Sequence, residues 1–129
     1  LALLDLARRD GMRAMAREWA RGMVHPSRLG GPVFEAVLDM FERRDAGIFA
    51  AQIQALLARP DATPQLPGIR CPTLLLTGAQ DSWSTPEQHA AMQQAMPGAQ
   101  LVVVPDCGHM STMEAPAAVR AALHQHLGL

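Results

Sequence analysis

The fold class of this chain follows from one short run, TLLLTG at residues 73–78. Its apolar residues do not alternate with polar ones, which is the pattern of a strand buried on both faces of a parallel sheet. A second run of this kind, LVVV at residues 101–104, is rich in β-branched residues and is followed by Pro105. The two runs predict neighbouring strands inside an α/β fold.

Helical patterns follow each of these strands. After the first strand, Thr85 is suited to the N-cap, Pro86 to the first helical position and Gln88 to the capping-box position, so a helix should run from there to Pro97. After the second strand, another helix is predicted over residues 116–127, with Val119, Leu123 and Leu127 on its apolar face. The order strand, helix, strand, helix over residues 69–129 implies parallel strands joined by a right-handed crossover.

The first half of the chain is helical in pattern over residues 1–58. Met12, Met15, Trp19 and Met23 are spaced by three and four positions, which lines one face of a helix, and Gly11 should weaken or split that helix. Two further amphipathic helices are predicted around residues 33–41 and 48–57. Residues 59–68 hold three prolines and are expected to form a linker.

Composition excludes several classes of protein. The 129 residues carry a formal net charge of −1, with 49% hydrophobic and 18% charged residues, which suits a globular domain and offers no basic excess for nucleic acid or a membrane surface. The apolar runs are far shorter than the roughly 20 residues of a membrane span. The 2 cysteines are too few for a disulfide framework and lack the paired spacing of a zinc site. We therefore expect a soluble, cytoplasmic protein with no metal or organic cofactor and no signal peptide.

The predicted sheet is incomplete. Two parallel strands leave unpaired edges and apolar faces that require further strands, and the helical first half does not supply them. The sequence also begins at Leu1 within a helical pattern. We expect the chain to be a piece of a longer protein, its sheet completed by a missing segment or by another copy of the chain.

Two side chains with acid–base chemistry follow the predicted strands. Asp81 comes shortly after the first strand and His109 shortly after the second. Because functional groups of parallel α/β sheets gather on the loops that leave the carboxyl ends of the strands, the two should meet at one edge. A carboxylate bound to one imidazole nitrogen fixes the tautomer and leaves the other nitrogen as a general base.

The ordered set of motifs from Ile69 to Leu127 resembles the carboxy-terminal part of α/β-hydrolase-fold enzymes. The matching features are the strand ending at Gly78, the Gly78-x-x-Asp81 turn with Thr85-Pro86, the Val-rich strand, Gly108-His109, Glu114-x-Pro116 and the closing helix. The resemblance implies that Asp81 is the triad acid and His109 the triad base. It also implies that residues 1–58 are the helical cap over the active site, and that the activity is hydrolysis of a small ester or related acyl compound.

The chain departs from that family at the nucleophile. The serines are Ser27, Ser82, Ser84 and Ser111, and none lies in a Gly-x-Ser-x-Gly elbow. We therefore expect a fragment that supplies the acid and the histidine and is inactive alone. The alternative is a non-catalytic binding or oligomerisation module built on half of a hydrolase fold.

Other side chains have weaker functional interpretations. Cys107 could be a thiolate nucleophile beside His109, although residues two apart in one loop rarely reach each other in the required way. Trp83 is expected to pack under the cap or the loop, with a ligand contact as the alternative. His124 and His126 are spaced by two on one helix and so point to different faces, which argues against a metal pair. The methionines of the first half are expected to fill a core, with an apolar acyl pocket as the alternative.

Overall fold

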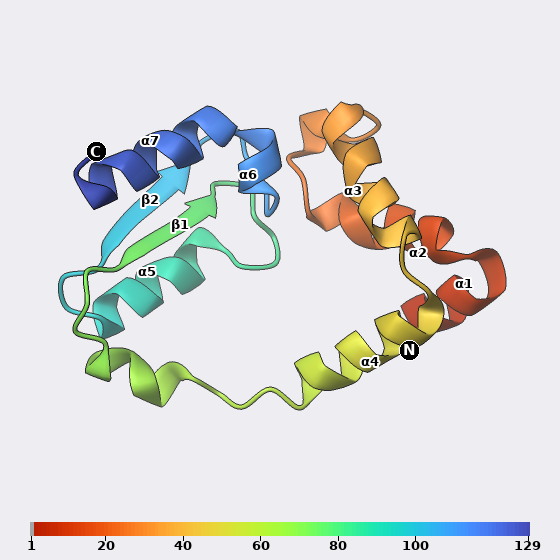
Figure 1. Ribbon diagram of the computed structural model, residues 1–129, viewed down its shortest axis with the longest axis horizontal. Helices are drawn as coiled ribbons and strands as arrows, with labels where there is room; N and C mark the ends of the chain where they lie inside the picture. The colour runs from red at the N-terminus through yellow and green to blue at the C-terminus, as the bar shows by residue number, and fades with distance from the viewer. Residues whose placement is uncertain (1) are drawn as a thin grey trace. The chain divides into compact units, whose positions relative to one another are not determined.

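The computed structural model describes residues 2–129 and divides into two compact units (Figure 1). The first unit contains the residues up to Arg21 together with Pro26–Pro60. The second contains Gly22–His25 together with Asp61–Leu129. The four residues Gly22–His25 thus belong with the second unit although they are far from the rest of it in sequence.

The first unit is entirely helical. Its helices are α1 (Ala2–Asp10), α2 (Met12–Trp19), α3 (Pro32–Glu42) and α4 (Ala46–Leu57), and short 3-10 helices lie at η1 (Ala20–Gly22) and η2 (Pro26–Arg28). The predicted split at Gly11 is confirmed, because this residue has φ of 90° and separates α1 from α2. Asp45 caps α4 by accepting a hydrogen bond from the amide of Ile48 at 2.8 Å.

The interior of the first unit is filled by methionine and aromatic side chains. Met15 and Phe49 are almost completely buried, and Met12 lies in the same cluster. The Trp19 ring packs against Phe41 and Phe49 with centroid distances of 5.2 and 5.3 Å. This confirms the interpretation of Met12 and Met15 as core residues, whereas Met40 is 41% exposed.

The second unit contains the parallel sheet. Strand β1 (Leu74–Gly78) pairs with β2 (Gln100–Val104), in a register that runs from Leu74 opposite Gln100 to Gly78 opposite Val104. The helices of this unit are η3 (Thr63–Gly68), α5 (Pro86–Ala95), α6 (Ser111–Glu114) and α7 (Pro116–Leu127). The predicted order of strand, helix, strand and helix is confirmed, as is the capping box at the start of α5. The chain is therefore a partial α/β fold, with a single pair of parallel strands among the described residues.

Two expectations about this unit were wrong in detail. The strands are not buried on both faces, since Val103 is 42% exposed and most other strand residues are only half-buried. On α7 the buried residue is Ala122, while Leu123 and Leu127 are 45% and 64% exposed. Both differences have one physical cause: two strands cover too little area to bury apolar faces that suit a larger sheet. Part of the proline-rich linker forms η3, with Pro64 in its first turn and Pro67 inside it.

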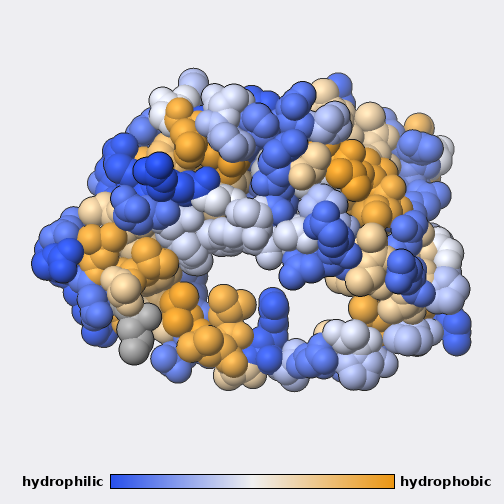
Figure 2. Space-filling view, turned by 180° about the vertical axis from the view of Figure 1, so that it is seen from behind, coloured by the Kyte–Doolittle hydropathy of each residue, from blue (hydrophilic) through white to orange (hydrophobic). Residues whose placement is uncertain are grey.

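None of the described helices is both long enough and apolar enough to cross a membrane. Apolar side chains nevertheless reach the surface of the first unit, where α1 and α4 border a cavity of about 370 Å³. This region is the orange surface at the lower left of Figure 2. Its apolar lining includes Leu3, Leu4, Phe49, Ile53 and Leu57.

Candidate active site

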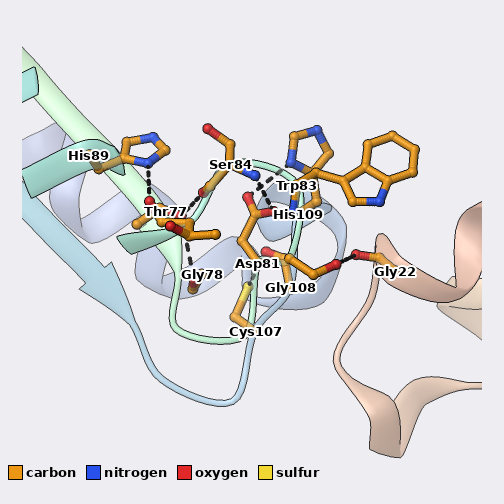
Figure 3. A network of polar contacts seen from close by, with 12 residues as sticks. Gly22, Thr77, Gly78, Asp81, Trp83, Ser84, His89, Cys107, Gly108 and His109 are labelled. Atoms are coloured by element: carbon orange, nitrogen blue, oxygen red, sulfur yellow. Dashed lines mark hydrogen bonds and ion pairs between the residues drawn. The ribbon is translucent and has the colours of Figure 1, made fainter. Parts of the chain in front are cut away.

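The two loops that leave the sheet bring an acid and a histidine together. Because Gly78 and Val104 are paired at the carboxyl ends of parallel strands, the loops that follow them start at the same edge. Asp81 Oδ2 lies 2.9 Å from Nδ1 of His109 (Figure 3). The expected Asp–His hydrogen bond is therefore present.

The two partners of this bond differ in their exposure. The Asp81 side chain is 5% exposed, whereas that of His109 is 37% exposed. The Trp83 ring lies beside the imidazole, with centroids 5.5 Å apart and planes inclined by 42°. Trp83 thus packs against the histidine of the neighbouring loop.

The second oxygen of Asp81 is held by its own loop. Oδ1 accepts hydrogen bonds from the amides of Trp83 and Ser84, both at 2.9 Å. Burial raises the pKa of Asp81, but the hydrogen bonds from the Ser84 amide, the His109 ring and the Trp83 amide outweigh it, so the net pKa lies below the ordinary value of 3.8. A depressed pKa means that this carboxylate stabilises the fold fully above 3.8, and that the contribution is lost as the pH falls through the lower pKa of the folded state.

The ionised carboxylate determines the tautomer of His109. An ionised Asp81 can only accept, so Nδ1 of His109 must carry the proton of their shared hydrogen bond. In the neutral imidazole, Nε2 then has a free lone pair. The arrangement can take up a proton at Nε2 and stabilise the imidazolium that results.

Gln80 fastens the acid loop to the histidine loop. The backbone N–H of Gln80 donates to the backbone carbonyl of Cys107 at 2.9 Å. The side-chain oxygen of Gln80 accepts a hydrogen bond from the backbone N–H of Cys107 at 3.0 Å. This role of Gln80 could not be predicted from the sequence, because no local pattern shows that a loop glutamine binds a backbone amide 27 positions further along the chain.

Gly78 allows the same two loops to approach. A Cβ at this position would lie 2.2 Å from the carbonyl oxygen of Cys107 and 2.3 Å from that of Gly108. Both atoms belong to the backbone of the histidine loop, so neither can move aside like a flexible side chain.

Replacing Gly78 with alanine should therefore destabilise the protein. We expect Gly78→Ala to lower the free energy of unfolding by about 2–3 kcal/mol, within the range for overpacked sites. Denaturant unfolding measures the change. Gly68→Ala is the matched control, since nothing lies within 4 Å of a Cβ there and its φ is not positive. Equal stability of the two variants would contradict the argument.

Two further candidate residues have contacts of their own. Cys107 is fully buried and its Sγ is 3.6 Å from the carbonyl of Gly108, a position that no substrate reaches from solvent. His126 Nδ1 lies 3.5 Å from Oε1 of Gln100. Among residues 2–129, no group of three or more His, Cys, Asp or Glu side chains is arranged to hold a metal ion.

Comparison with known proteins gives the class of the chain. A family model described as "Alpha/beta hydrolase family" matches residues 1–122, and the chain belongs to that family. No curated protein matches it.

Solved structures agree with the family. A thermophilic esterase from Thermogutta terrifontis is 34% identical with a TM-score of 0.86, and the match covers 98% of this chain and 47% of the esterase. The enol-lactonase from Burkholderia xenovorans LB400 is 28% identical with a TM-score of 0.84, over 99% of this chain and 49% of the lactonase. A hydrolase from Pseudomonas aeruginosa PA01 is 25% identical with a TM-score of 0.86, over 99% and 48%. The chain thus spans about half the length of these proteins and forms a partial α/β-hydrolase fold.

Proposed function

We propose that this chain supplies the acid and the general base of a serine-type hydrolase that acts on small esters or related acyl compounds. The observation that carries the proposal is the 2.9 Å bond between buried Asp81 and half-exposed His109 at the carboxyl edge of the parallel strands. The esterase and the lactonase among its structural relatives support the substrate class.

In this proposal His109 moves the protons of acyl transfer. Nε2 takes the proton of a serine hydroxyl as the serine oxygen attacks the carbonyl carbon of the substrate, and the imidazolium then protonates the leaving alcohol. A water molecule then attacks the carbonyl carbon of the acyl enzyme with the same proton transfers through His109, and the carboxylic acid is released from the serine. Asp81 holds the ring in the required tautomer and stabilises the imidazolium.

The nucleophile and the oxyanion hole come, in this proposal, from a segment outside the 129 residues. None of the four serines lies in a Gly-x-Ser-x-Gly elbow. Residues 1–58 act as the cap that shapes substrate choice. In this proposal the half-exposed strands pair with strands of the same outside segment, or with another copy of the chain. The exposed apolar residues of α7 pack against that same partner.

Ester turnover tests the proposal. The gene product that contains this chain should hydrolyse p-nitrophenyl acetate and should be labelled at one serine by a fluorophosphonate probe. The 129-residue chain alone should do neither, and light scattering should find it associated. A gene product that binds no probe and turns over no ester would instead favour the non-catalytic module.

A further inference from the structure

A second buried carboxylate lies beneath the histidine loop. Glu114, the last residue of α6, is 6% exposed. Its Oε1 accepts a hydrogen bond from the amide of Gly108 at 3.0 Å, and its Oε2 accepts from the amide of His25 at 2.7 Å. One carboxylate thus joins two backbone segments that are far apart in sequence.

Both segments contact the candidate active site. Gly108 directly precedes His109, and His25 ends the segment Gly22–His25, which we call the tether. The tether carbonyl of Met23 accepts from the amide of Met110 at 3.0 Å, so the amides on both sides of His109 are held. At the other end of the tether, the carbonyl of Gly22 accepts a hydrogen bond from the hydroxyl of Ser82 at 2.9 Å (Figure 3). Ser82 directly follows Asp81 in the sequence.

The tether also packs closely against the histidine loop. A Cβ at Gly108 would lie 2.7 Å from the carbonyl carbon of Val24 and 2.9 Å from the amide nitrogen of His25. Only a glycine permits this approach, and the approach sets the two amides at the distance that a single carboxylate spans.

We infer that Glu114 is a positioning residue for His109: its carboxylate fastens the Gly108 amide to the tether and so fixes the imidazole against Asp81. The inference rests on the proposed function, in which the position of His109 matters for turnover. A glutamine cannot replace this carboxylate, because the two amides donate to different oxygens and a glutamine side chain has an acceptor oxygen at only one of the two positions. The second amide would face an NH₂ group and remain unpaired in a buried place.

The test is Glu114→Gln in the gene product that contains the chain. We expect kcat to fall about 10- to 100-fold with KM within about threefold, since a misplaced general base slows chemistry more than binding. Glu114→Asp keeps the charge and should recover part of kcat.

Two controls separate positioning from loss of stability. Glu87→Gln makes the same chemical change at an exposed site on α5 and should leave the kinetics unchanged. Ala122→Gly lowers stability through a buried residue of α7 that lies outside both loops. If Glu114→Gln and Ala122→Gly lower Tm equally and also lower kcat equally, Glu114 is merely structural and the inference is overturned.

A measurement without turnover distinguishes failure of the inference from failure of the proposed function. The Nδ1 proton of His109 should give a low-field proton resonance in the wild type, and Glu114→Gln should weaken it or speed its exchange with water. An unchanged resonance overturns the inference even where the enzyme is active. A lost resonance supports it even where no ester is hydrolysed.

Discussion

Removing the imidazole of His109 should abolish nearly all turnover of the protein that contains this chain. We expect His109→Ala to lower kcat by about 10⁵- to 10⁶-fold, the scale of loss when the base of a serine triad is removed. The reason is geometric, since in the proposed function Nε2 of His109 accepts the serine proton and the ionised Asp81 orients the ring. Steady-state hydrolysis of p-nitrophenyl acetate measures the change, and the fluorophosphonate labelling rate reports the reactivity of the serine directly.

The fold should tolerate this substitution, because the His109 side chain is 37% exposed. His124→Ala is the matched control, since it removes an exposed histidine from α7, outside both the acid loop and the histidine loop. A His109→Ala protein that is folded and retains kcat within tenfold of the wild type would remove the general base from the proposal. The remaining family likeness would then support the non-catalytic module.

Local patterns predicted most of the second unit and the acid–histidine pair. The two apolar runs mark the strands, and the capping box at Thr85 marks the helix between them. A strand, helix, strand order implies parallel neighbours, so the loops that carry Asp81 and His109 could be placed at one edge of the sheet from the sequence. These features depend on residues close in sequence or on a topological rule that holds for nearly all parallel sheets.

The groups that hold this pair in place could not be predicted in the same way. Gln80 and Glu114 reach backbone amides 27 and 89 positions away, and such contacts depend on rotamers and on the packing of whole segments. For Glu114, the sequence offered a local signal in the motif Glu114-x-Pro116 after the histidine. This motif marks a turn, but it does not show which backbone amides the carboxylate binds. The exposure of the Leu123 and Leu127 side chains on α7 was not predicted either. Hydrophobic periodicity shows which residues share a helix face, but it does not show what covers that face.

Replacing the acid by its amide should be nearly as damaging as removing the base. In Asp81→Asn, the side-chain oxygen should stay on the amides of Trp83 and Ser84, because both are donors and only oxygen can accept from them. The NH₂ group then faces Nδ1 of His109 and can only donate a hydrogen bond to it. Nδ1 must therefore be unprotonated, so the ring proton moves to Nε2. A histidine in that tautomer has no lone pair for the serine proton, and we expect kcat to fall by about 10⁴-fold.

The tautomer makes this prediction separable from a general loss of structure. In ¹⁵N spectra of His109, the protonated nitrogen should change from Nδ1 in the wild type to Nε2 in Asp81→Asn. Asp106→Asn is the matched control on the neighbouring loop, since Asp106 is exposed and asparagine tolerates its φ of 51°. If Asp81→Asn kept the wild-type tautomer and still lost activity, the carboxylate would act by charge alone, because the ring would already be correctly oriented. If it kept both the tautomer and the activity, Asp81 would only stabilise its loop through the Trp83 and Ser84 amides.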